Sequence, residues 1–145
     1  MALHLIKLCV GADSVEDLQS FVDERLRSAQ LAGQVAESGH VTRVSPKRAE
    51  EVLAGGSLYW VIRGHVQVRQ TILRFDPVEG ADGIQRCRIV LDPTLRLTNW
   101  LPRRPFQGWR YLKPDDAPAD LGASGAEVDE IPVHLRRELV ELGLL

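Results

Sequence analysis

The order of apolar and polar residues predicts that the chain begins with a strand followed by a helix. Residues 3–11 (LHLIKLCVG) are mostly apolar and end at a glycine, which is typical of a buried strand. Over residues 12–30, apolar side chains recur every three or four positions, as they do on one face of a helix. Asp13 or Ser14 can cap this helix, and Gly33 is expected beyond its end.

The centre of the chain predicts a set of antiparallel strands. A weak strand is expected around residues 40–44, then a short helix with Ser45 as its cap and Pro46 in its first position. Further strands are expected over residues 57–64, 65–75 (with a bulge), 84–93 and 94–101, and a turn is expected over residues 76–83. The pattern predicts an α+β domain built on a small mixed or barrelled antiparallel sheet.

The C-terminal part of the chain has a different composition. Residues 1–113 are expected to form a single α+β domain. Residues 114–131 are acidic and rich in Pro, Gly and Ala, which favours a linker or loop. This segment is either solvated or folded back over the basic residues before it. Residues 132–145 predict an amphipathic C-terminal helix that packs on the domain.

Length and composition are those of an ordinary globular domain, at 145 residues with 44% hydrophobic and 26% charged residues. The apolar runs are far shorter than the ~18 residues that a membrane-spanning helix needs. The N-terminus shows no export signal, and both cysteines lie in apolar, strand-like runs. We therefore expect a cytoplasmic protein with reduced thiols and no membrane association.

Charge is unevenly distributed along the chain. Residues 40–113 hold 13 Lys/Arg and 6 Asp/Glu, a net +7, whereas the flanking residues hold 5 and 14, a net −9, so that the whole chain is −2. Eleven of the 13 basic residues in the central region are Arg, whose planar fork suits phosphate. The central region therefore favours an anionic partner.

Residues 100–114 (WLPRRPFQGWRYLKP) combine aromatic and basic side chains on a stretch that its prolines and glycine keep from being helical. This composition is typical of surfaces that stack nucleic-acid bases and pair with phosphates. The candidate binding residues are Arg86, Arg88, Arg103, Arg104, Trp109, Arg110 and Lys113, with Arg63, Arg69, Arg74, Tyr59 and Trp60 as secondary candidates. The alternative is that the aromatic side chains belong to the core and the arginines only solvate a strand face.

No pattern indicates a metal site, a cofactor or a catalytic centre. The four histidines are scattered, and none has metal-ligand spacing. Cys87, His65 and Asp92 are residue types of a nucleophilic triad, but a thiol inside an apolar strand is expected to be inert. No catalytic residue is assigned, and a non-enzymatic role is favoured.

Three stretches resemble a known family: LIKLCVGADSVEDL, PKRAEEVLAGGSLYWVIRGHVQVRQTI and RPFQGWRYLKPDDAPADL. They are similar to a family known as a domain of unknown function (number 1489), found chiefly in alphaproteobacteria. That resemblance implies a bacterial cytosolic protein and no activity. The order of a helix ending in Gly-Gly and two strands also resembles the PUA, ASCH and EVE superfamily of small β-barrels. This looser likeness implies binding of RNA or modified bases at a basic and aromatic barrel edge.

The leading hypothesis is an RNA- or nucleotide-binding module that uses the basic and aromatic residues. One alternative is an interaction or scaffold domain, since Trp, Tyr and Arg also anchor protein interfaces. Another is a small enzyme acting on a nucleotide-like anion.

Overall fold

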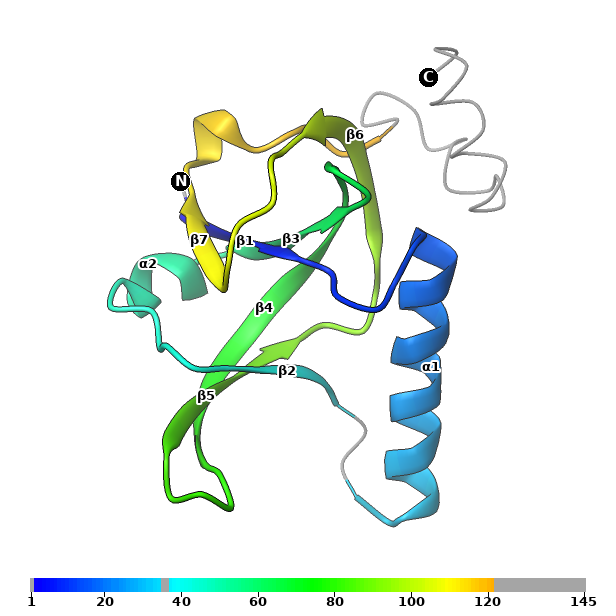
Figure 1. Ribbon diagram of the computed structural model, residues 1–145, viewed down its shortest axis with the longest axis vertical. Helices are drawn as coiled ribbons and strands as arrows, with labels where there is room; N and C mark the ends of the chain where they lie inside the picture. The colour runs from blue at the N-terminus through cyan, green and yellow to red at the C-terminus, as the bar shows by residue number, and fades with distance from the viewer. Residues whose placement is uncertain (1, 35–36, 122–145) are drawn as a thin grey trace.

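The computed structural model describes residues 2–34 and 37–121, which form a mixed α+β fold (Figure 1). Within these ranges there are seven strands in one sheet and two α-helices, so the predicted α+β class is confirmed. The strands are β1 (His4–Leu8), β2 (Ser38–Thr42), β3 (Ser57–Ile62), β4 (His65–Glu79), β5 (Gln85–Leu91), β6 (Arg96–Pro102) and β7 (Trp109–Leu112). The helices are α1 (Val15–Leu31) and α2 (Ala49–Leu53), and a 3₁₀ turn covers Pro114–Asp116.

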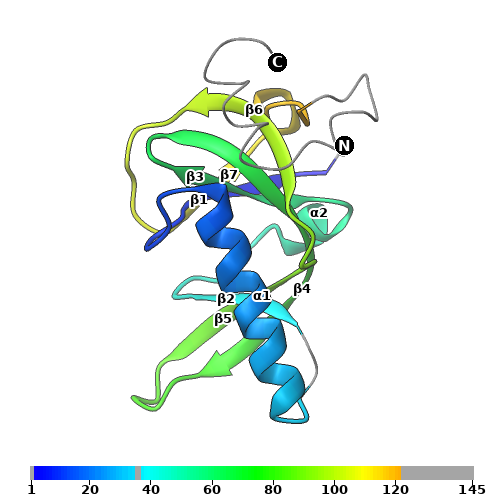
Figure 2. The same cartoon turned by 90° about the vertical axis from the view of Figure 1, so that its right-hand side faces the viewer.

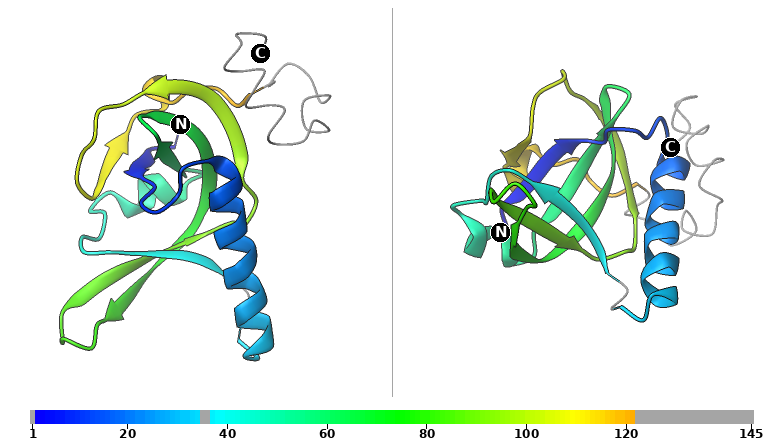
Figure 3. Two further views of the ribbon diagram at one scale, coloured as in Figure 1. Left: turned by 45° about the vertical axis from the view of Figure 1, so that its right-hand side comes forward. Right: turned by 60° about the horizontal axis from the view of Figure 1, so that its bottom comes forward.

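The sheet is mixed and open, with the strand order β2-β5-β4-β3-β1-β7 and with β6 paired to β4. β1 and β3 are parallel, and the other pairs are antiparallel. The pairing of β4 with each of its three neighbours shifts in register, and such irregularities increase local bending and twist. The sheet accordingly curls on itself, and the far ends of β4 and β5 project as a hairpin (Figure 3).

The concave face of the sheet carries the main core. Its alternate residues, among them Leu5, Leu58 and Ile89, are fully buried. Helix α1 lies beside the sheet (Figure 2) and buries Val15 and Leu18, with Val22 one turn further. Ser14 caps α1, because its hydroxyl oxygen accepts from the Asp17 N–H at 3.1 Å. Of the two caps predicted for this helix, Asp13 and Ser14, the structure shows Ser14.

Two local predictions were wrong, the second of them in part. Helix α2 begins at Ala49 with Arg48 at its cap, not with Ser45, and the Arg48 N–H donates to the Tyr111 hydroxyl at 3.1 Å. Strand β4 continues into the predicted turn of residues 76–83 and ends at Glu79, whereas residues 80–83 form a turn as predicted. The strand continues there because Pro77 lies where β4 pairs with β5 alone, an edge position that tolerates proline.

The proline-rich stretch, which the sequence predicts only to be non-helical, contains a strand. Trp109–Leu112 form β7 because the free edge of β1 offers backbone partners to this segment. A local sequence pattern cannot predict this strand, because its pairing partner β1 lies about a hundred residues earlier in the chain.

The residues after β7 continue along the sheet as far as the structure describes them. Asp120 forms an isolated bridge with Thr98, and Leu121 is buried. The predicted linker over 114–131 lies partly outside the described residues, and the predicted helix over 132–145 lies entirely outside them. Neither described α-helix is long and apolar enough to cross a membrane.

Candidate functional site

The two edges of the curled sheet meet through side chains. β2 pairs with β5 and β7 pairs with β1, and no ladder joins β2 to β7 in the part of the chain described. The Trp109 indole N–H instead donates to the Val44 carbonyl oxygen at 2.8 Å, two residues beyond the end of β2. The hydrogen bond between Arg48 and Tyr111 crosses the same seam.

A cavity of about 520 Å³ opens at this seam and is lined by Lys7, Val41, Thr42, Arg43, Val44, Gln107, Gly108, Trp109 and Arg110. We call it the seam pocket. Three of its nine lining residues are basic and none is acidic. A volume of this order is typical of small-molecule sites, which measure about 300–1,000 Å³.

Lys7 is the most deeply placed cation of the seam pocket. It lies half-buried in β1, in register with Trp60 of β3 and Trp109 of β7, so all three share the concave face. Burial lowers the pKa of the Lys7 ammonium, although the nearby Cys9 partly opposes this. Within the described residues no carboxylate forms an ion pair with Lys7. A partly buried, unpaired ammonium favours an anion as its partner.

Trp109 presents a fixed aromatic ring at the pocket. Its side chain is half-buried, held by the hydrogen bond to Val44 and packed edge-on against Tyr111 with ring centroids 4.9 Å apart. The next residue, Arg110, pairs with Ile6 and is on the opposite face of β7, where its guanidinium lies 5.9 Å from the Phe106 ring centroid. Trp109 therefore supplies an aromatic wall of the pocket, whereas Arg110 lines the pocket from the other face of β7.

A smaller recess of about 60 Å³ lies further inside the sheet, between it and α1. In it the Trp60 N–H donates to the Gln70 amide oxygen at 2.9 Å, and His40 packs edge-on against Trp60 at 5.4 Å. Burial, followed by the charges of Lys7 and Arg25, lowers the pKa of His40 to about 4. His40 is therefore neutral near neutral pH, and the recess, which Arg25 also lines, has a size that suits about two water molecules.

The thiol of Cys9 lines the same recess. Burial raises its pKa to about 11, against weaker opposing effects of Arg25 and Lys7. Since the thiolate is the nucleophile, Cys9 is unreactive at neutral pH. Burial also raises the pKa of Cys87, in agreement with the expectation that this thiol is inert.

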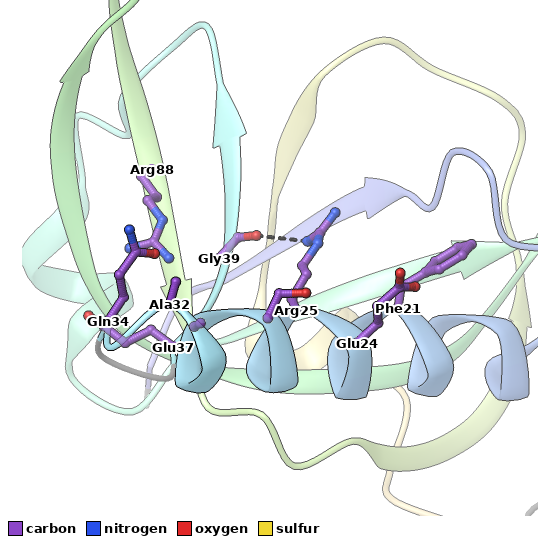
Figure 4. Close-up of a pocket in the computed structure, with 10 residues that line it drawn as sticks. Phe21, Glu24, Arg25, Ala32, Gln34, Glu37, Gly39 and Arg88 are labelled. Carbon is purple, nitrogen blue, oxygen red and sulfur yellow. Dashed lines mark hydrogen bonds between the residues drawn. The ribbon is translucent and has the colours of Figure 1, made fainter.

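A second, wider cavity of about 640 Å³ lies between α1 and the outer side of β2 and β5 (Figure 4). Arg25 bridges the two sides by donating to the Gly39 carbonyl oxygen at 3.0 Å. Arg88, a predicted binding residue, extends over Gly39 in this cavity and not in the seam pocket. Glu24 and Glu37 also line the cavity, so its charge is mixed.

Several predicted cations already have carboxylate partners. Arg86 pairs with Asp82 at 2.8 Å, and Arg69 makes two hydrogen bonds of 2.7 Å to Asp120. The remaining pairs are Arg74 with Asp76 and Glu37, and Arg63 with Asp13 at 4.0 Å. These arginines offer less free charge to a ligand than the sequence pattern indicates.

The other predicted residues are separated from one another. Tyr59 and Trp60 are buried at 5% and 4% exposure, so neither offers an open surface ring. Arg103 is half-buried after β6, and its backbone N–H donates to Gly64. Arg104 and Lys113 are exposed at the two ends of the segment that contains β7.

Trp109 and Arg110 are the two predicted residues that line the seam pocket. Sequence reasoning missed Lys7, Thr42 and Arg43. Lys7 could have been singled out from the sequence, because it is the single charged residue in an otherwise apolar predicted strand. Among residues 2–34 and 37–121, no three His, Cys, Asp or Glu side chains gather as a metal site would require.

Comparison with known proteins places the chain in a family without assigning it an activity. No curated protein and no solved structure matches it. The family profile described as "Protein of unknown function (DUF1489)" matches residues 5–145, nearly the whole chain. The chain therefore belongs to the DUF1489 family.

Proposed function

We propose that this protein binds single-stranded RNA at the seam pocket. The observation that carries the proposal is the lining of this pocket, which contains Trp109 and the three basic residues Lys7, Arg43 and Arg110 and no acidic residue. Arg and Lys neutralise phosphate, and an accessible aromatic ring stacks on a base whatever its identity.

The energetics of the pocket fit this role. Stacking of one base on an aromatic side chain contributes about 1–3 kcal/mol. The hydrogen bond from Trp109 to Val44 holds the ring in place, which reduces the entropy lost when a base stacks on it. The resemblance of the strand order to small RNA-binding β-barrels supports the same proposal, as an analogy of fold.

The proposal is tested by fluorescence anisotropy with a labelled single-stranded RNA of about eight nucleotides. The logarithm of the affinity is expected to fall as the logarithm of the salt concentration rises, with a slope no steeper than about −2 for the three basic residues of the lining. Replacing Arg43 and Arg110 together by Gln is expected to weaken binding at least about tenfold and to make the slope shallower.

The matched control replaces Arg27 and Arg96 by Gln, because both are exposed and neither lines the pocket. This variant removes the same charge and is expected to bind within about twofold of the wild type. Equal losses in the two variants would show that the affinity comes from overall charge, and no binding at low salt would refute the proposal.

A further inference from the structure

We infer that the seam pocket takes a single nucleotide: its ligand is a nucleoside monophosphate unit whose phosphate meets Lys7 while its base lies against Trp109. This inference rests on the proposed function and specifies how much of an RNA the site holds. It predicts that free mononucleotides bind to the same pocket.

The size and the boundaries of the pocket favour a compact ligand. Its volume of about 520 Å³ is that of a site for one small molecule. The contact between Trp109 and Val44 and the contact between Arg48 and Tyr111 both cross the seam. Both contacts close the seam on the side of β7 that holds Trp109 and Tyr111, so a strand cannot run along the seam past them.

Lys7 and Trp109 are placed to hold two parts of one nucleotide. They are register partners on adjacent strands and share a face, and adjacent strands are about 5 Å apart. Two neighbouring side chains on one face can contact two parts of the same small ligand, here its phosphate and its base. The half-buried ammonium also lacks a carboxylate partner among the described residues, so a phosphate would supply the missing opposite charge.

Some of the arginines outside the pocket are already paired or lie elsewhere. A protein that follows a strand over many nucleotides needs a positively charged groove along the backbone. Two of the predicted cations are not free for this role, since Asp120 holds Arg69 and Asp82 holds Arg86. Arg88 lies in the cavity beside α1, with two glutamates in its lining.

The test is calorimetric titration with the four nucleoside 5′-monophosphates, the matching nucleosides and inorganic phosphate, using the full chain. We expect one monophosphate per chain, bound at least about tenfold more tightly than either its nucleoside or phosphate, because two subsites are engaged together. The same monophosphate is expected to displace the labelled RNA.

Lys7→Met separates the phosphate subsite from the base subsite. Methionine keeps an unbranched side chain in β1 and removes the charge, so the fold is expected to persist. Monophosphate affinity should fall about tenfold or more, whereas nucleoside affinity should stay within about twofold. The matched control is Lys47→Met, which removes an exposed lysine outside the pocket lining.

The outcomes distinguish this inference from the proposed function. RNA binding that no monophosphate displaces and that Lys7→Met leaves unchanged would overturn the single-nucleotide inference and leave RNA binding standing. Phosphate that binds as tightly as the monophosphates would also overturn the inference, in favour of a simple anion site. The absence of binding by every probe would overturn both.

Discussion

The indole N–H of Trp109 donates to the carbonyl oxygen of Val44 at 2.8 Å and so joins the two edges of an open sheet. Trp109→Phe keeps an aromatic ring there but removes this donor. We expect the free energy of unfolding to fall by about 1 kcal/mol, measured by urea denaturation.

Trp100→Phe is the control for this substitution. Trp100 is half-buried like Trp109 but contacts His65 on the β6 side of the sheet. Trp100→Phe is expected to lower the free energy of unfolding by less than Trp109→Phe does. Equal losses would mean that the effect of Trp109→Phe comes from ring size and not from the hydrogen bond across the seam.

The ion pair between Arg69 and Asp120 is expected to stabilise the fold. Arg69 donates two hydrogen bonds to Asp120 and a third, of 2.9 Å, to the Ser57 hydroxyl oxygen, with only 20% of its side chain exposed. Asp120→Asn leaves this partly buried guanidinium without its charged partner. We expect a loss of about 1 kcal/mol, after allowing for the partial exposure of Asp120.

Asp82→Asn tests the same chemistry at a solvent-exposed pair. The Arg86–Asp82 pair has similar geometry, but water screens it more strongly. Urea denaturation should show a smaller effect than for Asp120→Asn. The reverse order would contradict the view that burial decides the contribution.

The stability of the protein is expected to decline between pH 6.5 and pH 4 because of His40. Its pKa is lowered to about 4 in the folded protein from an ordinary value of 6.5. A histidine with a lowered folded pKa contributes fully above the unfolded value, and its contribution is lost as the pH falls from 6.5 towards 4. We expect a decline of roughly 1–2 kcal/mol, after allowing for screening by solvent.

The comparison of wild type with His40→Gln isolates this effect. Burial also lowers the pKa of His4, so the relevant measurement is the difference between the two pH profiles of unfolding. The variant should lose part of the decline between pH 6.5 and pH 4. Identical profiles would show that protonating His40 costs the folded protein nothing.

Gly56 is expected to tolerate no larger residue. A Cβ at this position would lie 2.2 Å from the Leu3 carbonyl oxygen and 2.5 Å from that of Val52, and both are backbone atoms. Gly56→Ala should therefore destabilise the protein by several kcal/mol, on the order of the largest effects of single substitutions. Gly64→Ala is the comparison, because φ is +79° there but nothing lies within 4 Å of the added carbon.

Thermal unfolding of the two glycine variants gives the measurement. Backbone strain alone at Gly64 is expected to cost about 1–2 kcal/mol. Similar midpoints for the two variants would show that the backbone near α2 moves to accommodate a methyl group.

The sequence by itself determined most of the elements and their order. The apolar period of α1, the cap at Ser14 and the alternation in β5 are local features, because each depends on residues within a few positions of one another. The single charge in β1 was visible for the same reason. The basic character of the central region was also readable, since charge is a property of composition.

Only the tertiary structure decided which of those charges remain available and what surrounds them. Asp120 lies 51 positions from Arg69, and Trp109 lies 65 positions from Val44, so neither contact leaves a local pattern. The curl of the sheet brings Lys7 of β1, Arg43 after β2 and Trp109 of β7 to one pocket. It does so because pairing and register operate between distant segments, whereas periodicity reports only which face of its own element a side chain occupies.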